Sequence, residues 1–226
     1  MDGTRVLLEA AADAPLAKFL FVSSSTVYGA NAEIPFRELN RLGEPTSPYG
    51  ASKQEAEAVC RDFAENKNVP VVCVRPFNVY GPGMRPDLAI TVFANAIIQG
   101  AVLPVYGNGS VRRDFSHVSD VCCGMYQALI RPESIGATIN LGYGNPVTVQ
   151  ELIRLLEKAL GKSANIQWHA ELPQDLPVTF ACLEQAREFL DYQPRISLEE
   201  GINDYCKWLN ESVADSGEPA IQENQS

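Results

Sequence analysis

The sequence lacks several features that mark common classes of protein. Its 226 residues include only two histidines, and its six cysteines form no Cys-x-x-Cys pair, which argues against a zinc site. No apolar run reaches the roughly 18 residues that a membrane-spanning helix needs. The N-terminus lacks the charged and apolar regions of a signal peptide. We therefore expect no metal site and no membrane partner, and a cytoplasmic protein with reduced thiols.

Basic residues are also scarce. Lysine and arginine number 18 against 28 aspartates and glutamates, which gives a formal net charge of −10. Nucleic-acid-binding proteins usually carry a basic face, so this balance argues against a nucleic-acid partner. It does not exclude a nucleotide ligand, because a few well-placed arginines can bind a diphosphate. The hydrophobic fraction of 46% is that of an ordinary globular protein.

Two apolar segments with a helix between them predict a βαβ unit. Residues 18–22 form a continuous apolar run, typical of a strand buried on both faces of a parallel sheet. Ser47 followed by Pro48 predicts the start of a helix that runs to residue 63. Residues 69–74 predict the next buried strand. The crossover between two such strands is right-handed.

The rest of the chain alternates helical and extended patterns. Helices are expected over residues 4–12, 90–99 and 119–130, and capping boxes at 148–151 and 197–200 predict two more, ending at 161 and 208. Extended segments are expected over residues 102–106, 112–115 and 138–141. The polar residues 211–226 show no periodicity and predict a disordered tail.

Tyr49 and Lys53 carry the most chemical information. Four residues apart on a helix, they share one face. An ammonium there favours the phenolate, and a tyrosine so tuned is a general base for an alcohol and, once protonated, the matching acid. A serine after the strand at 18–22 could hold the same alcohol. The pattern points to hydride chemistry at a carbinol carbon, although Tyr-x-x-x-Lys alone is common by chance and depends on its context.

Five segments supply that context. They are residues 23–29 (SSSTVYG), 47–53 (SPYGASK), 75–82 (RPFNVYGP), 113–120 (RDFSHVSD) and 175–179 (DLPVT). In order and spacing they resemble the NAD-dependent epimerase/dehydratase family of nucleotide-sugar enzymes, which are extended short-chain dehydrogenases. The resemblance runs from about residue 3 to 209.

The resemblance implies an α/β fold: the C-terminal part of a Rossmann-like doubly wound parallel sheet, plus a small α/β substrate-binding region. Residues 1–80 are then a partial Rossmann-like catalytic domain. Residues 81–210 form the nucleotide-sugar-binding region, interleaved with the last core strand near 138–141. Residues 211–226 are the tail.

The activity implied is NAD-dependent epimerisation at C4 of a UDP-sugar through a 4-keto intermediate. Residues 85–89 and 175–180 look most like the members that convert UDP-glucuronate to UDP-galacturonate. The alternatives are a neutral UDP-hexose 4-epimerase and a catalytically silent chain that only binds nucleotide or a partner. Dehydratases of the family place an Asp-Glu pair where this sequence has Ser25 and Thr26, so epimerisation is favoured over dehydration.

The resemblance also assigns roles to single residues. Tyr49 removes the proton of the sugar 4-hydroxyl, Lys53 binds the nicotinamide ribose, and Ser24 hydrogen-bonds the 4-oxygen. Ser24 is chosen because it lies four residues before Tyr28, where the family places Ser or Thr. Besides Tyr49 and Lys53, the cofactor contacts implied are Pro76 and Phe77. The substrate contacts implied are Ser25, Thr26, Asn78, Arg85, Pro104, Tyr106, Arg113 and Asp175.

Some of these assignments have structural alternatives. Arg85 suits the C6 carboxylate of a glucuronate, since arginine binds carboxylates through two parallel bonds, but it could also be a solvated loop residue. Core packing explains Tyr106 equally well. His117 is expected to be structural, and Asp120 a cap or first-turn acid of the following helix.

One family feature is absent from the sequence. The glycine-rich turn that binds the dinucleotide pyrophosphate is missing, and Met1 stands where the family has reached its fourth helix. We expect a fragment that lacks two or three βαβ units, roughly 60 to 90 residues. Residues 18–22 would then form a bare sheet edge. Family analogy also predicts a homodimer.

Overall fold

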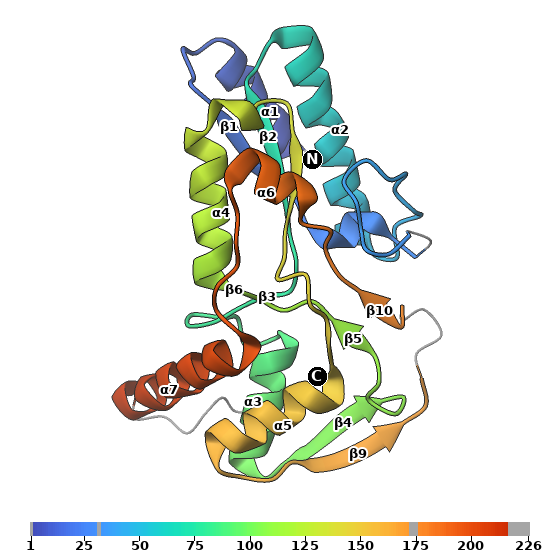
Figure 1. The fold of residues 1–226 in the computed structure, drawn as a ribbon, viewed down its shortest axis with the longest axis vertical. Helices are drawn as coiled ribbons and strands as arrows, with labels where there is room; N and C mark the ends of the chain where they lie inside the picture. The colour runs from blue at the N-terminus through green and yellow to red at the C-terminus, as the bar shows by residue number, and fades with distance from the viewer. Residues whose placement is uncertain (1, 31–32, 172–175, 217–226) are drawn as a thin grey trace.

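The computed structural model describes residues 2–30, 33–171 and 176–216. Within them the chain builds two parts stacked along the long axis of an elongated molecule (Figure 1). The sheet half contains a three-stranded parallel sheet, and the helical half contains a two-stranded sheet and three helices. Short strands lie between them.

The sheet of the sheet half has the order β1–β2–β7, formed by β1 (Phe19–Val22), β2 (Val71–Pro76) and β7 (Thr138–Leu141). Both pairings are parallel. The predicted βαβ unit is therefore confirmed, with α2 (Pro48–Lys67) as its crossover. The second strand begins two residues later than predicted, because Asn68 ends the helix in the left-handed region and the Val69 N–H still bonds to the Phe63 carbonyl.

Helices cover both faces of this sheet. α1 (Asp2–Ala12) and α2 pack on the side chains of Phe21, Val71 and Cys73. α4 (Val118–Ile130) and α6 (Glu184–Leu190) lie on the other face, over Val72, Val74 and Ile139. Because both faces are covered, the strands read as apolar runs without alternation. Among the described residues β1 pairs only with β2 and forms the sheet edge, as predicted.

The helical half is built around three helices, α3 (Ala89–Gln99), α5 (Val149–Leu160) and α7 (Leu198–Ser216). They share one apolar core, and β4 (Val102–Tyr106) and β9 (Asn165–His169) pair in parallel beside it. The sequence patterns missed β9 and α6. The last helix continues to Ser216, so residues 211–216, predicted as tail, are helical; residues 217–226 lie outside the described part.

Short segments complete the fold: two single-turn 3₁₀ helices pack within the sheet half, and short strands lie between the halves. These segments are η1 (Ser25–Tyr28), β3 (Val79–Tyr80), β5 (Arg112–Arg113), β6 (Ser116–His117), η2 (Pro132–Ser134), β8 (Val147–Thr148) and β10 (Val178–Thr179). After residue 80 the chain enters the helical half, returns for α4 and β7, and returns again for α6. The boundary predicted at residue 80 therefore marks only the first point at which the chain passes from the sheet half to the helical half.

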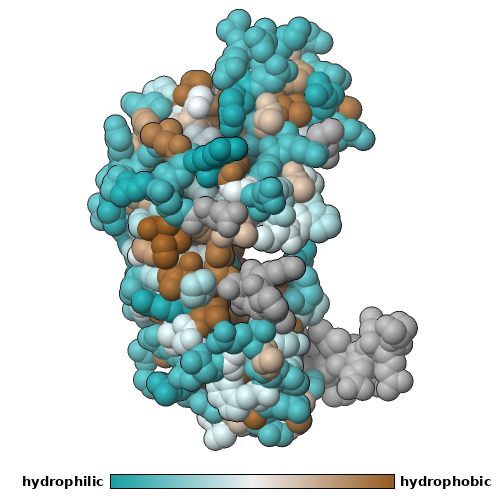
Figure 2. Space-filling model, turned by 90° about the vertical axis from the view of Figure 1, so that its right-hand side faces the viewer, coloured by the Kyte–Doolittle hydropathy of each residue, from teal (hydrophilic) through white to brown (hydrophobic). Residues whose placement is uncertain are grey.

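Figure 2 shows the face of the molecule that points to the right in Figure 1. Hydrophilic surface covers its two ends, while hydrophobic surface gathers near the middle. Among the described residues no helix is both long and apolar enough to span a membrane.

Candidate active site

The predicted catalytic side chains lie around the carboxyl end of β1. Ser24 follows this strand and caps η1, where its Oγ accepts hydrogen bonds from Thr26 N at 3.2 Å and Thr26 Oγ1 at 3.0 Å. Lys53, on α2, donates from Nζ to the Val22 carbonyl at 2.8 Å. The same Nζ lies 5.8 Å from the ring centroid of Tyr49. One strand end thus gathers the serine and the Tyr-x-x-x-Lys pair.

Close packing of α2 on η1 produces this arrangement. Gly50 lies so near η1 that a Cβ at this position would stand 3.0 Å from the Thr26 carbonyl oxygen. Gln54 Nε2 donates to the carbonyls of Val27 at 2.7 Å and Gly43 at 2.9 Å.

Tyr49 is 54% exposed, and its hydroxyl has no hydrogen-bond partner among the described residues. The hydroxyl is therefore open to a ligand.

A cavity of about 220 Å³, here called the η1 cavity, lies beside η1. It is lined by Ser25, Thr26, Gly29, Phe36, Thr46, Asn78, Arg113, Leu176 and Thr179. It brings together four of the predicted substrate residues, which are Ser25, Thr26, Asn78 and Arg113. The sequence reasoning missed the other five. Leu176 and Thr179 belong to the 175–179 segment, so sequence reasoning could have found them. Phe36 and Thr46 come from a loop whose position no periodic pattern predicts.

Arg113 gives the η1 cavity its charge. It is the single charged side chain among the described residues that line it. Its Nη1 donates to the carbonyls of Arg112 at 2.9 Å and Leu176 at 2.8 Å, which holds the guanidinium in place. Asn78 is fixed in the same way, by a 2.8 Å bond from Nδ2 to the Asp114 carbonyl. A cation fixed in this way at the wall of a cavity suits an anionic group of a ligand.

Three other predicted substrate residues, Arg85, Pro104 and Tyr106, are not among the described residues that line this cavity. Arg85 is exposed and pairs with Asp87 at 3.2 Å. Pro104 and Tyr106 lie on β4, where the Tyr106 ring packs 5.4 Å from that of His169. Asp175 lies outside the described residues. The substrate roles of these four stay predictions.

The two remaining cofactor assignments lie at the end of β2. Pro76 is the half-buried last residue of the strand. The side chain of Phe77 is fully buried, with its ring 6.2 Å from Tyr28 and 6.1 Å from Phe36. Its N–H donates to the Leu141 carbonyl at 2.9 Å. The side chain and the N–H group of Phe77 are therefore already engaged within the protein. The predicted cofactor contact of Phe77 stays a prediction, and it would involve the backbone carbonyl.

His117 and Asp120 have structural contacts, as expected. His117 caps α4, with Nδ1 accepting from Ser119 N at 3.3 Å, and its ring lies edge-on to Tyr80 at 5.5 Å. Asp120, in the first turn of α4, accepts from the N–H groups of Arg195 and Ile196. Both residues tie α4 to its neighbours.

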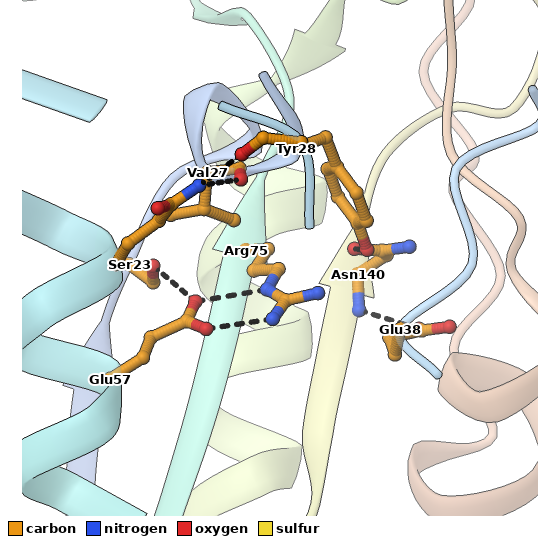
Figure 3. A network of polar contacts seen from close by, with 9 residues as sticks. Ser23, Val27, Tyr28, Glu38, Glu57, Arg75 and Asn140 are labelled. Carbon is orange, nitrogen blue, oxygen red and sulfur yellow. Dashed lines mark hydrogen bonds and ion pairs between the residues drawn. The ribbon is translucent and has the colours of Figure 1, made fainter. Parts of the chain in front are cut away.

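A buried polar network behind the site was not predicted (Figure 3). Glu57 and Arg75 form an ion pair through two bonds, Nε to Oε1 at 2.9 Å and Nη2 to Oε2 at 2.7 Å. Ser23 Oγ donates to Glu57 Oε1 at 2.5 Å. The guanidinium lies 4.8 Å from the ring centroid of Tyr28, whose hydroxyl donates to Asn140 Oδ1 at 2.7 Å. Burial raises the pKa of Tyr28 to about 12, against the opposing effect of Arg75.

A signal for this network was present in the sequence. Arg75 directly follows the apolar residues of a strand that is buried on both faces, and Glu57 stands four residues after Lys53 on a packed helix. Each charge requires a partner at such a place. Which partner it finds depends on the tertiary fold.

Comparison with known proteins identifies the family. Residues 1–142 match the model of the NAD dependent epimerase/dehydratase family, and the chain therefore belongs to that family. This confirms the resemblance, and with the Rossmann-type architecture of the solved neighbours it confirms the predicted α/β class. The family is NAD-dependent, and solved neighbours were crystallised with NAD.

Particular relatives narrow the comparison. The UDP-glucuronate 4-epimerase of Thermodesulfobacterium geofontis is 33% identical over 215 residues, which cover 94% of this chain and 65% of that protein. The UDP-glucuronic acid 4-epimerase of Bacillus cereus, in complex with UDP-glucuronic acid and NAD, is 33% identical with a TM-score of 0.85, over 92% of this chain and 66% of that one. A dTDP-glucose 4,6-dehydratase of Streptomyces venezuelae with NAD bound is 29% identical with a TM-score of 0.85, over 94% and 66%. The chain thus spans about two thirds of the length of these relatives.

Proposed function

We propose that this chain supplies the catalytic residues and nucleotide-sugar contacts for NAD-dependent epimerisation at C4 of a UDP-sugar, with UDP-glucuronate converted to UDP-galacturonate. One observation carries the proposal. Ser24, Tyr49 and Lys53 meet at the carboxyl end of β1, and a cavity beside η1 has Arg113 as the one charged side chain among its described lining residues.

The proton chemistry follows from the three side chains. The Tyr49 oxygen, which has no hydrogen-bond partner in the described part of the chain, takes the proton of the sugar 4-hydroxyl and later returns it. Ser24 Oγ donates a hydrogen bond to the 4-oxygen and keeps it in reach of Tyr49. The ammonium of Lys53, on the same face of α2, stabilises the phenolate form. When the 4-keto sugar is released from these contacts, it rotates and presents its other face before the proton is returned.

The residues present fit the nicotinamide ribose of NAD. The Lys53 ammonium lies at the exposed end of β1, 5.1 Å from the Phe21 ring centroid, and the open Tyr49 hydroxyl lies on the next turn. Both are donors of the kind that ribose hydroxyls accept. When bound there, NAD would be the oxidant: it would accept the hydride from C4 and later return it.

The lining of the η1 cavity supports epimerisation over dehydration. Elimination of water needs an acid and a base next to the substrate. Ser25 and Thr26 occupy the positions where the dehydratases of the family place those groups, and no carboxylate is among the described lining residues. A hydroxyl cannot readily take up such a proton at neutral pH.

The choice of UDP-glucuronate over a neutral UDP-hexose rests on Arg85. Its guanidinium is exposed and pairs with a single aspartate on the same loop, so a substrate carboxylate could replace that partner. The homodimer expected from the family stays a prediction.

The test is turnover of UDP-glucuronate and UDP-glucose with NAD present, with products separated by chromatography. We expect UDP-glucuronate to be converted faster. Tyr49→Phe should lower kcat by about 10²–10⁴-fold, because the proton acceptor is removed, while UDP binding is kept. Tyr126→Phe, a change at an exposed tyrosine on α4, is the control and should have no effect. Unchanged turnover in the Tyr49 variant would contradict the mechanism.

A further inference from the structure

The buried ion pair of Glu57 and Arg75 needs an explanation other than stability. The two side chains are 2% and 3% exposed. Moving two charges out of water costs about as much free energy as their attraction returns, so an apolar pair of similar volume is often as stable or more so. What an ion pair does provide is direction, because a guanidinium fork donates to both oxygens of a carboxylate in few orientations.

Glu57 stands at one end of a row of side chains on α2. Tyr49, Lys53 and Glu57 follow at intervals of four residues and therefore lie along one side of the helix. Lys53 bonds to the carbonyl of Val22, and Glu57 accepts from the hydroxyl of Ser23. Two successive turns of the helix are thus bound to Val22, the last residue of β1, and to Ser23, which follows it; the next residue is Ser24.

The partner of Glu57 fixes it from the opposite side. Arg75 belongs to β2, the neighbour of β1 in the sheet, and its guanidinium is held between the carboxylate and the Tyr28 ring (Figure 3). Tyr28 ends η1, and its hydroxyl bonds to Asn140 on β7. The network therefore joins α2, η1 and the strands of the sheet half, which are the elements that carry Ser24, Tyr49 and Lys53.

We propose that Glu57 is a positioning residue that fixes the rotation of α2, and so the placement of Tyr49 and Lys53 against Ser24, through its ion pair with Arg75 and its bond from Ser23. This inference rests on the proposed function, since it assigns Glu57 a task in that site. Glu57 touches no reacting atom; it acts through the helix.

The test removes both charges at once. Glu57→Gln alone leaves Arg75 buried without a counter-charge, which could unfold the chain. The double variant Glu57→Met/Arg75→Met keeps the volume, and we expect its thermal midpoint to stay close to that of the unchanged chain. Its kcat should fall by about 10–100-fold with KM nearly unchanged, the loss expected when reacting groups are misplaced by about 1 Å.

A second measurement does not depend on turnover. Fluorotyrosine incorporated at Tyr49 reports its surroundings by fluorine NMR. We expect the double variant to shift or broaden this resonance. The matched control is Lys158→Met/Glu199→Met, which removes an exposed ion pair between α5 and α7 and should change neither kcat nor the resonance. Ser23→Ala, which keeps the ion pair, should shift the resonance in the same sense by less, and it serves if the double variant does not fold.

The outcomes separate the two claims. An unchanged fluorine resonance and an unchanged kcat in a folded double variant overturn the role of Glu57. If the unchanged chain shows no turnover but the resonance responds as expected, the positioning role holds and the proposed function fails.

Discussion

At the scale of single residues, Asp114 shows how one buried carboxylate can order the backbone around a cavity. It is fully buried next to Arg113. Its two oxygens accept hydrogen bonds from the N–H groups of Tyr143, Gly144 and Ala181, at 3.0 to 3.1 Å. Gly142 is required there, because a Cβ would lie 2.7 Å from Asp114 Oδ2. The segments that precede β8 and follow β10 are thus held to the strand that carries Arg113.

Asp114→Asn should therefore destabilise the fold by roughly 2–4 kcal/mol, since an amide NH₂ cannot accept from these N–H groups and leaves at least one unpaired. Urea unfolding measures the change. Asp62→Asn, at an exposed site on α2, is the control and should stay within about 0.5 kcal/mol. Equal stability of the two variants would contradict the role given to Asp114.

The same variant carries a pH signature. Burial raises the pKa of Asp114 above its ordinary 3.8, against the hydrogen bonds from Ala181, Gly144 and Tyr143. The folded chain then holds this proton more tightly than the unfolded chain, so the contribution of Asp114 to stability falls as pH rises from its unfolded pKa through the folded one. The difference in free energy of unfolding between the unchanged chain and the Asp114→Asn variant should therefore become smaller as pH rises above about 4.

At the scale of elements, the C-terminal end of α4 is held by one lysine. Lys18, just before β1, donates from Nζ to the carbonyls of Ala128 and Arg131 and to Ser134 Oγ. These carbonyls lie at the C-terminal end of the helix, where the last C=O groups have no N–H partner within the helix and the helix dipole is negative. The contact fastens α4 to the first strand of the sheet.

Lys18→Met should lower the free energy of unfolding by about 2–3 kcal/mol, because the partly buried carbonyls lose a charged donor. The matched control is Lys162→Met, since Lys162 donates to the Ile98 carbonyl at the end of α3 at 2.6 Å but is exposed. Its loss should cost less than about 1 kcal/mol. Equal losses measured in urea would show that burial of the Lys18 contact has no effect.

The elements differ in how far the sequence predicted them. The β1–α2–β2 unit, the Ser47 cap, the Thr148 cap and the capping box of Ser197 and Glu200 were predicted correctly because their signals are local: an apolar run, a side-chain cap, a proline in the first turn. β9 was missed although Ile166 and Trp168 alternate with polar residues in Asn165–His169, a signal for a strand that the sequence analysis did not use. The segment is largely exposed, and it is a strand through its pairing with β4.

The site divides in the same way. Ser24, Tyr49 and Lys53 come from two segments joined by one βαβ unit, so sequence could place them together, and the structure does. The Glu57–Arg75 pair and the lining residues Phe36 and Thr46 depend on contacts between distant segments. No periodic pattern encodes those contacts.

At the scale of the whole molecule, the η1 cavity is built where the halves meet. Its lining comes from η1 in the sheet half and from β5 and β10 between the halves. Arg113 and Asn78 are held there by backbone carbonyls. We expect these two side chains to bind the diphosphate of UDP. Both are fixed before a ligand arrives, which reduces the ordering cost of binding.

Calorimetric titration with UDP tests this preformed site. We expect UDP to bind without added NAD, because Asn78 and Arg113 are already held in place by backbone carbonyls. Arg113→Met should weaken binding by about 10–100-fold, the effect of losing a charged hydrogen bond to phosphate. Arg112→Met is the matched control, since Arg112 precedes it on β5, donates to the Pro146 carbonyl and does not line the cavity. If both variants weakened binding equally, net charge near β5 rather than the geometry of Arg113 would explain the affinity, and the diphosphate would have to be placed elsewhere.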